Sequence, residues 1–137
     1  MKFIDIQNEV IKDYRIDLCD GSKCKRDWRR THAHPKQRRV CKWVQKNSFQ
    51  STFTLFHEIG HIEEYKSYMR RAEDEYYATT FAIQLCRKYN LEIPQKTLDD
   101  YQDYIDMEVE RGKRRGGKNY PIMNIHDFNL YGEVCNV

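Results

Sequence analysis

The chain has 137 residues, of which 33% are charged, a formal net charge of +3 at pH 7 and a mean hydropathy of -0.93. This composition predicts one domain with a polar surface, and it excludes a membrane-spanning protein because no apolar run approaches the roughly 18 residues that a bilayer requires. The N-terminal segment lacks the apolar core of a signal peptide and the five cysteines are an odd number, so we expect a cytoplasmic protein with reduced thiols.

The first third of the chain predicts a short helix followed by a small antiparallel sheet. Phe3, Ile6 and Val10 recur at helical spacing within residues 2–13. After them, apolar and polar residues alternate, and Asp20-Gly21 is a turn signal. We expect strands at residues 14–18, 23–30 and 38–44. Residues 31–36 are expected to form a loop, because a residue that precedes proline is biased away from helix.

The metal-binding signature H-E-x-x-H occurs at His57, Glu58 and His61, within residues 48–66, which are predicted to form a helix. Residues four apart share a helix face, so the two histidines can each offer a ring nitrogen to one zinc ion. Glu58 can take a proton from a water molecule on that ion. The preceding residues are apolar, and three polar side chains on a buried helix are costly without a metal. Core histidines with hydrogen-bond partners are the alternative.

A third zinc ligand is expected from the next predicted helix, residues 71–89, because catalytic zinc typically takes three protein ligands and a water. This helix begins with the acids Glu73, Asp74 and Glu75. Glu75 shares a face with small apolar residues, and it lies level with His61 if the two helices form a hairpin. We therefore expect Glu75 as the ligand, with Asp74 and Glu73 as less certain candidates. Alternatively, the three acids interact favourably with the positive end of the helix dipole, which would explain the cluster without a metal.

The remainder of the chain predicts a third helix, from about residue 97 to 111, and a tail. Residues 120–137 show no clear periodicity and are expected to be extended or loop. The predicted fold class is α+β, with a small antiparallel sheet packed on the metal-binding helix and two further helices. We expect a single domain over residues 1–137, with a core of about 1–111 and a basic, irregular tail at 112–137.

A second group of metal-binding side chains lies in the region of the predicted sheet. It consists of Cys19, Cys24, His32, His34 and Cys41. Four of these residues can make a tetrahedral structural zinc site, which would stabilise a small polar domain. The spacing of these residues is looser than that of paired C-x2-C motifs. The alternative is that the cysteines are reduced residues on strands and that the histidines lie in a loop, with no metal bound.

Charge is unevenly distributed along the chain. Residues 23–46 contain ten lysines and arginines and one acid, whereas residues 99–110 contain six acids and no lysine or arginine. Residues 111–118 are again basic and rich in glycine. Such basic segments predict binding to nucleic acid or to an acidic protein partner, and a solvated surface is the alternative. A non-catalytic, zinc-stabilised binding protein is therefore a second functional hypothesis beside a zinc hydrolase.

The H-E-x-x-H helix, the acidic cluster after it and the sequence Ala-Thr-Thr-Phe-Ala at residues 78–82 resemble the ImmA/IrrE family of small zinc metallopeptidases. The similarity covers about residues 48–85. In that family a second helix has a pattern near E-A-N-x-F-A, whose Glu is the third ligand. When Phe81-Ala82 is aligned with the Phe-Ala of the family pattern, the Glu position of that pattern falls on Tyr77. The acidic ligand would therefore be displaced toward the N-terminus, to Glu75 or a neighbour.

The resemblance implies a minimal zincin-like fold and gluzincin-like cleavage of a protein or peptide substrate. In this family the substrate is often a DNA-binding transcriptional repressor that is encoded on a mobile element or phage. Zinc is then the expected cofactor, Glu58 the expected general base, and no membrane is expected as a partner.

Overall fold

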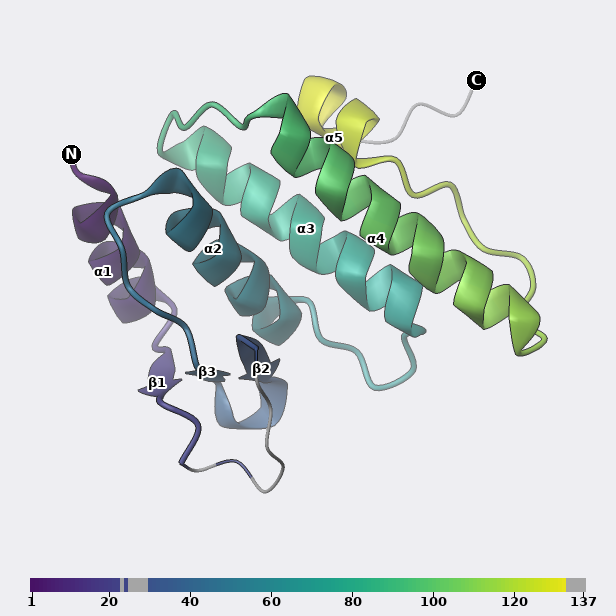
Figure 1. The fold of residues 1–137 in the computed structure, drawn as a ribbon, viewed down its shortest axis with the longest axis horizontal. Coiled ribbons are helices and arrows are strands. Elements are labelled where there is room, and N and C mark those ends of the chain that lie inside the picture. The colour runs from purple at the N-terminus through teal and green to yellow at the C-terminus, as the bar shows by residue number, and fades with distance from the viewer. Residues whose placement is uncertain (23, 25–29, 133–137) are drawn as a thin grey trace. The chain divides into compact units, whose positions relative to one another are not determined.

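The structure is a computed structural model that describes residues 1–22, 24 and 30–132, and Figure 1 shows its backbone. The chain divides into two compact units, an N-terminal unit (Met1–Tyr65) and a C-terminal unit (Lys66–Val137). Helices and a small sheet are both present, which confirms the predicted α+β class. Within the described residues, no helix is both long enough and apolar enough to span a bilayer.

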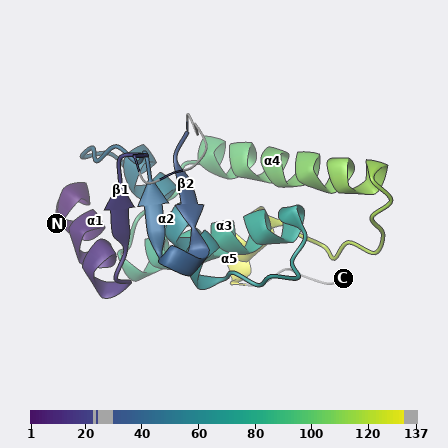
Figure 2. The same ribbon diagram turned by 90° about the horizontal axis from the view of Figure 1, so that it is seen from below.

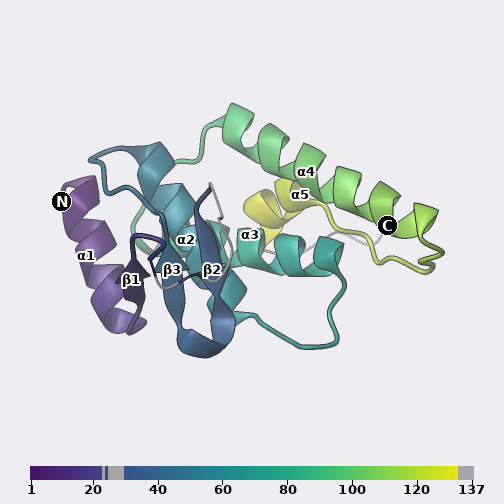
Figure 3. The same ribbon diagram turned by 60° about the horizontal axis from the view of Figure 1, so that its bottom comes forward.

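The described part of the N-terminal unit consists of helices and three short strands. In chain order these are α1 (Phe3–Asp13), β1 (Asp17–Cys19), β2 (His32–His34), the 3-10 helix η1 (Pro35–Gln37), β3 (Arg39–Cys41) and α2 (Phe49–Glu63). α1 buries Ile6 and Val10 and packs against α2, as the helical spacing of its apolar residues predicts. Figure 3 shows the three strands side by side in the order β1, β3, β2.

The sheet is mixed, so the prediction of an antiparallel sheet is wrong. β3 lies in the centre and pairs in parallel with β1 and antiparallel with β2. Parallel strands need a long connection, and the chain makes β2 and η1 between β1 and β3. Arg38 has a φ of 51°, in the left-handed region, and this residue reverses the chain between η1 and β3. β3 can therefore return antiparallel to β2.

Two predicted strands are shorter in the structure because residues with positive φ limit them. The strand predicted at 14–18 begins only at Asp17, since Arg15 has a φ of 54° after the end of α1. The strand predicted at 38–44 ends at Cys41, because Lys42 has a φ of 59°. A residue in the left-handed region cannot continue an extended strand.

The segments between these strands also differ from prediction. The loop expected at residues 31–36 contains β2 and the start of η1, so that prediction is wrong. Pro35 restricts His34 to extended backbone, which is compatible with a strand, and then occupies the first position of the 3-10 helix. The return strand expected at residues 23–30 falls largely outside the described residues.

α2 confirms the helix predicted around the H-E-x-x-H motif and is anchored at its first turn. The Oγ of Ser48 accepts a hydrogen bond from the backbone amide of Ser51 at 3.2 Å and caps the helix. Gln7 of α1 is fully buried, and its Nε2 donates to the carbonyl oxygen of Lys46 and to the Oγ1 of Thr52, each at 2.8 Å. These bonds join α1 to the start of α2. The apolar residues that α2 buries are Phe53, Leu55, Phe56, Ile59 and Ile62.

In the C-terminal unit, three helices pack together: α3 (Arg71–Lys88), α4 (Gln95–Arg114) and α5 (Ile125–Tyr131). α4 runs beside α3, as Figure 2 shows. α5 packs against both helices. α3 and α4 confirm the two further helices that the sequence predicts. α4 begins two residues earlier than expected, because Pro94, with a φ of -58°, is the residue before its first turn.

The prediction that residues 120–137 are extended or loop is wrong, because α5 lies within them. The side chain of Asn124 accepts hydrogen bonds from the backbone amides of His126 and Asp127 and begins this helix. Ile125 is fully buried. One capping residue and one buried apolar residue therefore define α5, and neither creates the periodicity from which helices are predicted.

Candidate metal centres

The first candidate centre, called the α2 site below, consists of His57, Glu58 and His61. The imidazole rings of the two histidines have centroids 4.7 Å apart and planes at 84° to each other. The Oε1 of Glu58 lies 3.8 Å from the Nδ1 of His57. His57 is 6% exposed, and the side chain of Glu58 is 12% exposed. Two shielded imidazoles on adjacent turns of a regular helix can bind one metal ion, and the carboxylate lies beside them.

The three acids predicted as third-ligand candidates lie at the start of α3, in the C-terminal unit. Glu75 is buried, and its Oε1 is 3.9 Å from the Nη2 of Arg71. Glu73 is half-buried and accepts a hydrogen bond from the Nε of Arg70. Asp74 is half-buried. Of the three acids, Glu75 is therefore the one whose negative charge is most costly to bury without a positive partner. Its coordination of an ion held by His57 and His61 stays a prediction.

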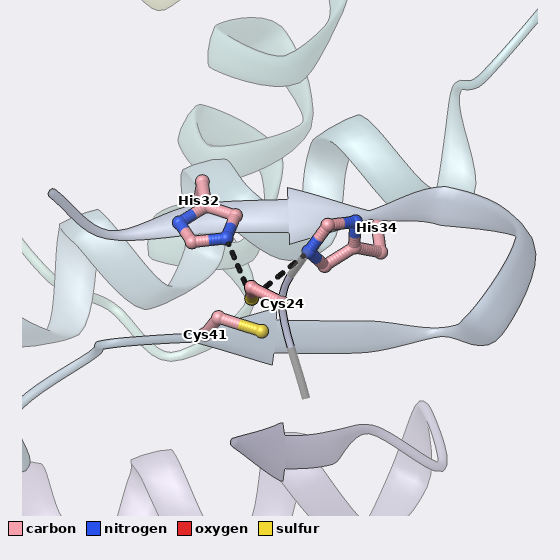
Figure 4. Close-up of side chains that lie close together, drawn as sticks. All are labelled: Cys24, His32, His34 and Cys41. Carbon is pink, nitrogen blue, oxygen red and sulfur yellow. Dashed lines mark hydrogen bonds between the residues drawn. The ribbon is translucent and has the colours of Figure 1, made fainter. Parts of the chain in front are cut away.

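The second candidate centre, called the sheet site below, consists of Cys24, His32, His34 and Cys41. One nitrogen or sulfur atom from each residue lies within 4.8 Å of the corresponding atoms of the other three. The Sγ of Cys24 is 3.2 Å from the Nε2 of His32 and 3.4 Å from the Nε2 of His34. Figure 4 shows both imidazoles turned toward this sulfur, with the sulfur of Cys41 beside it. Two thiols and two imidazoles are a common donor set for a transition metal.

The strand register explains why these side chains converge. His32 and His34 are two residues apart on β2, so they project from the same face of the sheet. Cys41 of β3 pairs directly with His32 and shares that face. Val40, whose side chain alternates to the opposite face, is fully buried. Cys24 donates its backbone amide to the carbonyl oxygen of Gly21, so it belongs to the turn that follows β1.

The surroundings of the two imidazoles of the sheet site are compatible with metal binding. The Nδ1 of His32 lies 2.8 Å from the carbonyl oxygen of Arg30, which only accepts hydrogen bonds. In its neutral form, His32 therefore carries its proton on Nδ1 and directs the Nε2 lone pair toward Cys24. Burial lowers the pKa of His34, and the nearby charges of His32 and Arg39 lower it further. Neutral imidazole is the form that binds metals.

The thiol of Cys41 is protonated when no metal is bound. Burial raises its pKa to about 12, and side-chain hydrogen bonds with Cys24 and Cys19 contribute to the shift. Metal binding would therefore release the proton from this thiol, as it does for other cysteine ligands.

Cys19, the fifth residue of the predicted group, lies beside the sheet site. It pairs with Cys41 across β1 and β3, and its Sγ accepts a hydrogen bond from the backbone amide of Gly21 at 3.2 Å. Among the described residues, the set with mutually close ligand atoms contains the other four and not Cys19. The signal that the sequence offers for this site is the His-x-His spacing, because it places both rings on one face of a strand. The expectation of a loop at residues 31–36 did not use this spacing.

No protein-family model, curated protein or solved structure matches the chain. The resemblance to the ImmA/IrrE family therefore rests on the motif residues alone, and membership of that family stays a prediction.

Proposed function

We propose that this chain is a zinc-dependent metallopeptidase whose ion is held by His57, His61 and Glu75. The observation that carries the proposal is the arrangement of the α2 site, in which two close imidazoles and a shielded carboxylate occupy one helix. Two imidazoles and one carboxylate are a ligand set found in catalytic zinc sites, where the fourth position is left for water. Glu75 is the buried acid at the start of α3 that completes this set in the proposal.

Glu58 is the proton carrier of the proposed reaction. When bound, zinc lowers the pKa of a coordinated water and polarises the carbonyl oxygen of a peptide bond. Glu58 takes the proton from the attacking water and delivers it to the nitrogen of the leaving amine. His57 and His61 are held in position by α2, because the hydrogen bonds of the buried Gln7 fix the first turn of that helix.

The proposed substrate is a protein or peptide. The motif resemblance favours a DNA-binding transcriptional repressor of a mobile element or phage. We also propose a cytoplasmic location, where a reducing environment keeps cysteine side chains as thiols.

The test is the Glu58→Gln variant, loaded with zinc and assayed on a library of quenched-fluorescent peptides. Proton transfer by a positioned side chain typically contributes about 10²–10⁴-fold, so we expect cleavage to fall by at least about 100-fold with unchanged zinc content. Glu63→Gln is the matched control, because Glu63 lies on the same helix but is exposed. Undiminished cleavage by Glu58→Gln, or no cleavage of the library by the zinc-loaded wild type, would contradict the proposal.

A second proposed function is a non-catalytic, zinc-stabilised protein that binds nucleic acid or an acidic protein partner. It is favoured by the exposed cations Arg114, Arg115 and Lys118 at the C-terminal end of α4. Phosphate contacts by such side chains make affinity fall linearly with the logarithm of salt concentration. We expect a steep salt dependence for binding to a DNA duplex, and an absence of binding in a gel shift at low salt would exclude the nucleic-acid form of this function.

A further inference from the structure

We propose that the sheet site binds a structural zinc ion through Cys24, His32, His34 and Cys41, independently of the α2 site. The proposal goes beyond the peptidase function, because it assigns a second ion to residues that take no part in the proposed hydrolysis. It rests on the convergence of the ligand atoms, on the strand register that produces it, and on the chemistry of the donors.

The observed separations are close to those around a tetrahedral zinc ion. Zinc lies at about 2.3 Å from sulfur and about 2.0–2.1 Å from nitrogen, so sulfur and nitrogen ligands are about 3.6 Å apart. The Sγ of Cys24 is 3.2 Å and 3.4 Å from the two Nε2 atoms. An outward adjustment of a few tenths of an ångström therefore accommodates the ion. Cys41, on the neighbouring strand, provides the fourth ligand atom within the same cluster.

The hydrogen bond of His32 prepares its ring for coordination. Metal-binding histidines commonly donate their second ring nitrogen to a carbonyl or carboxylate, which fixes both tautomer and orientation. The Nδ1 of His32 has this partner in the carbonyl oxygen of Arg30. Its Nε2 thus points toward the centre of the cluster, where the neutral ring offers a lone pair (Figure 4).

The donor set selects the kind of metal and the kind of site. Calcium and magnesium prefer oxygen ligands, whereas thiolate and imidazole suit zinc. Four protein ligands fill a tetrahedral shell and leave no position for a reacting water, which is the arrangement of structural zinc sites. A disulfide between two of the cysteines would not explain why two imidazoles converge on the same sulfur.

A structural ion would add to the contacts that stabilise a sheet of short strands. Each strand of the sheet is only three residues long, and small folding units often gain stability from a structural metal in addition to their apolar core. The ion would join Cys24 to β2 and β3 at once. Its binding energy would then contribute to the folding of the N-terminal unit.

The experiment uses the full chain in which His57→Ala and His61→Ala remove the α2 ligands. We expect this double variant to retain one zinc per chain by elemental analysis. After exchange with cobalt, we expect a sulfur-to-cobalt charge-transfer band in the near ultraviolet. The band reports on the sheet site, because the α2 site has no sulfur ligand. The same band is expected in the cobalt-loaded wild type, which keeps the test valid if the double variant does not fold.

Single variants in the same background identify the ligands. Cys24→Ser and His34→Ala should each lose the bound zinc, and Cys24→Ser should also lose intensity in the charge-transfer band. Cys19→Ser is the matched control, because Cys19 lies beside Cys41 but outside the group of four. The proposal is overturned if the cobalt-loaded wild type shows no charge-transfer band, or if Cys19→Ser removes the zinc and Cys24→Ser retains it. A peptidase assay that fails leaves these readouts unaffected.

Discussion

Gln7 is expected to contribute strongly to the stability of the N-terminal unit, although it lies outside both candidate metal centres. Its side chain is fully buried and donates two hydrogen bonds of 2.8 Å, to the carbonyl oxygen of Lys46 and the Oγ1 of Thr52. Each bond contributes about 1 kcal/mol net, and truncation also leaves a cavity that costs about 1 kcal/mol or more. Truncation also removes the buried Oε1 of Gln7, which has no hydrogen-bond partner among the described residues, and its removal offsets part of this loss by about 1 kcal/mol. We therefore expect Gln7→Ala to lower the free energy of unfolding by about 2 kcal/mol.

Urea denaturation followed by tryptophan fluorescence measures this effect. Trp43 lies in the N-terminal unit, where its Nε1 donates to the carbonyl oxygen of Ser51 at 2.9 Å, so its fluorescence reports on that unit. Gln45→Ala is the matched control, because the Nε2 of Gln45 also donates a 2.8 Å hydrogen bond to α1, at Asn8, but at the exposed surface. Surface substitutions of this kind usually change stability by less than about 0.5 kcal/mol.

Two results would refute this reasoning. One is a loss of less than about 1 kcal/mol in Gln7→Ala, which is smaller than the two hydrogen bonds together. The other is an equal loss in Gln7→Ala and Gln45→Ala, which would mean that burial does not determine the effect. A double-mutant cycle with Thr52→Ala isolates the Gln7–Thr52 bond, and a coupling near zero would show that this bond contributes nothing.

Two further predictions concern single side chains in the C-terminal unit. Burial raises the pKa of Cys86 to about 12, so near pH 8 only about one molecule in ten thousand carries the reactive thiolate. We expect iodoacetamide to leave Cys86 unmodified in the folded protein and to alkylate it in urea, as peptide mass mapping can show; rapid labelling of the folded protein would contradict the burial. In a Cys24→Ser background, Glu75→Ala should weaken zinc binding, whereas its matched control Glu73→Ala should leave the affinity unchanged, and the reverse result would assign the ligand to Glu73.

The elements that the sequence predicts well are those defined by nearby residues. α2 has a serine cap at Ser48, a run of apolar residues and the H-E-x-x-H motif, all within residues 48–63. Helical spacing likewise predicts α1, because Ile6 and Val10 form one buried face. In each case the information lies within a few turns of one helix, where side-chain spacing determines which residues share a face.

The features that the sequence does not predict depend on contacts between distant residues. The parallel pairing of β1 with β3 joins residues such as Asp17 and Arg39, and no local pattern specifies it. The sheet site depends on the same long-range register, because His32 opposes Cys41 only when β2 and β3 pair as they do. The spacing of the cysteines and histidines therefore indicates a group of five, and the register distinguishes the four that converge.

The order of the elements along the chain has a consequence for how the protein matures during synthesis. Cys24, His32, His34 and Cys41 and both α2 histidines lie within the first 65 residues, whereas Glu75 belongs to the following unit. Domains emerge from the ribosome and fold from the N-terminus onward. Under the proposed ligand sets, a nascent chain can thus acquire its structural zinc while the peptidase site still lacks its third ligand. Under this proposal, hydrolytic activity would begin only after translation has passed into α3, and the unfinished chain would be protected from its own chemistry.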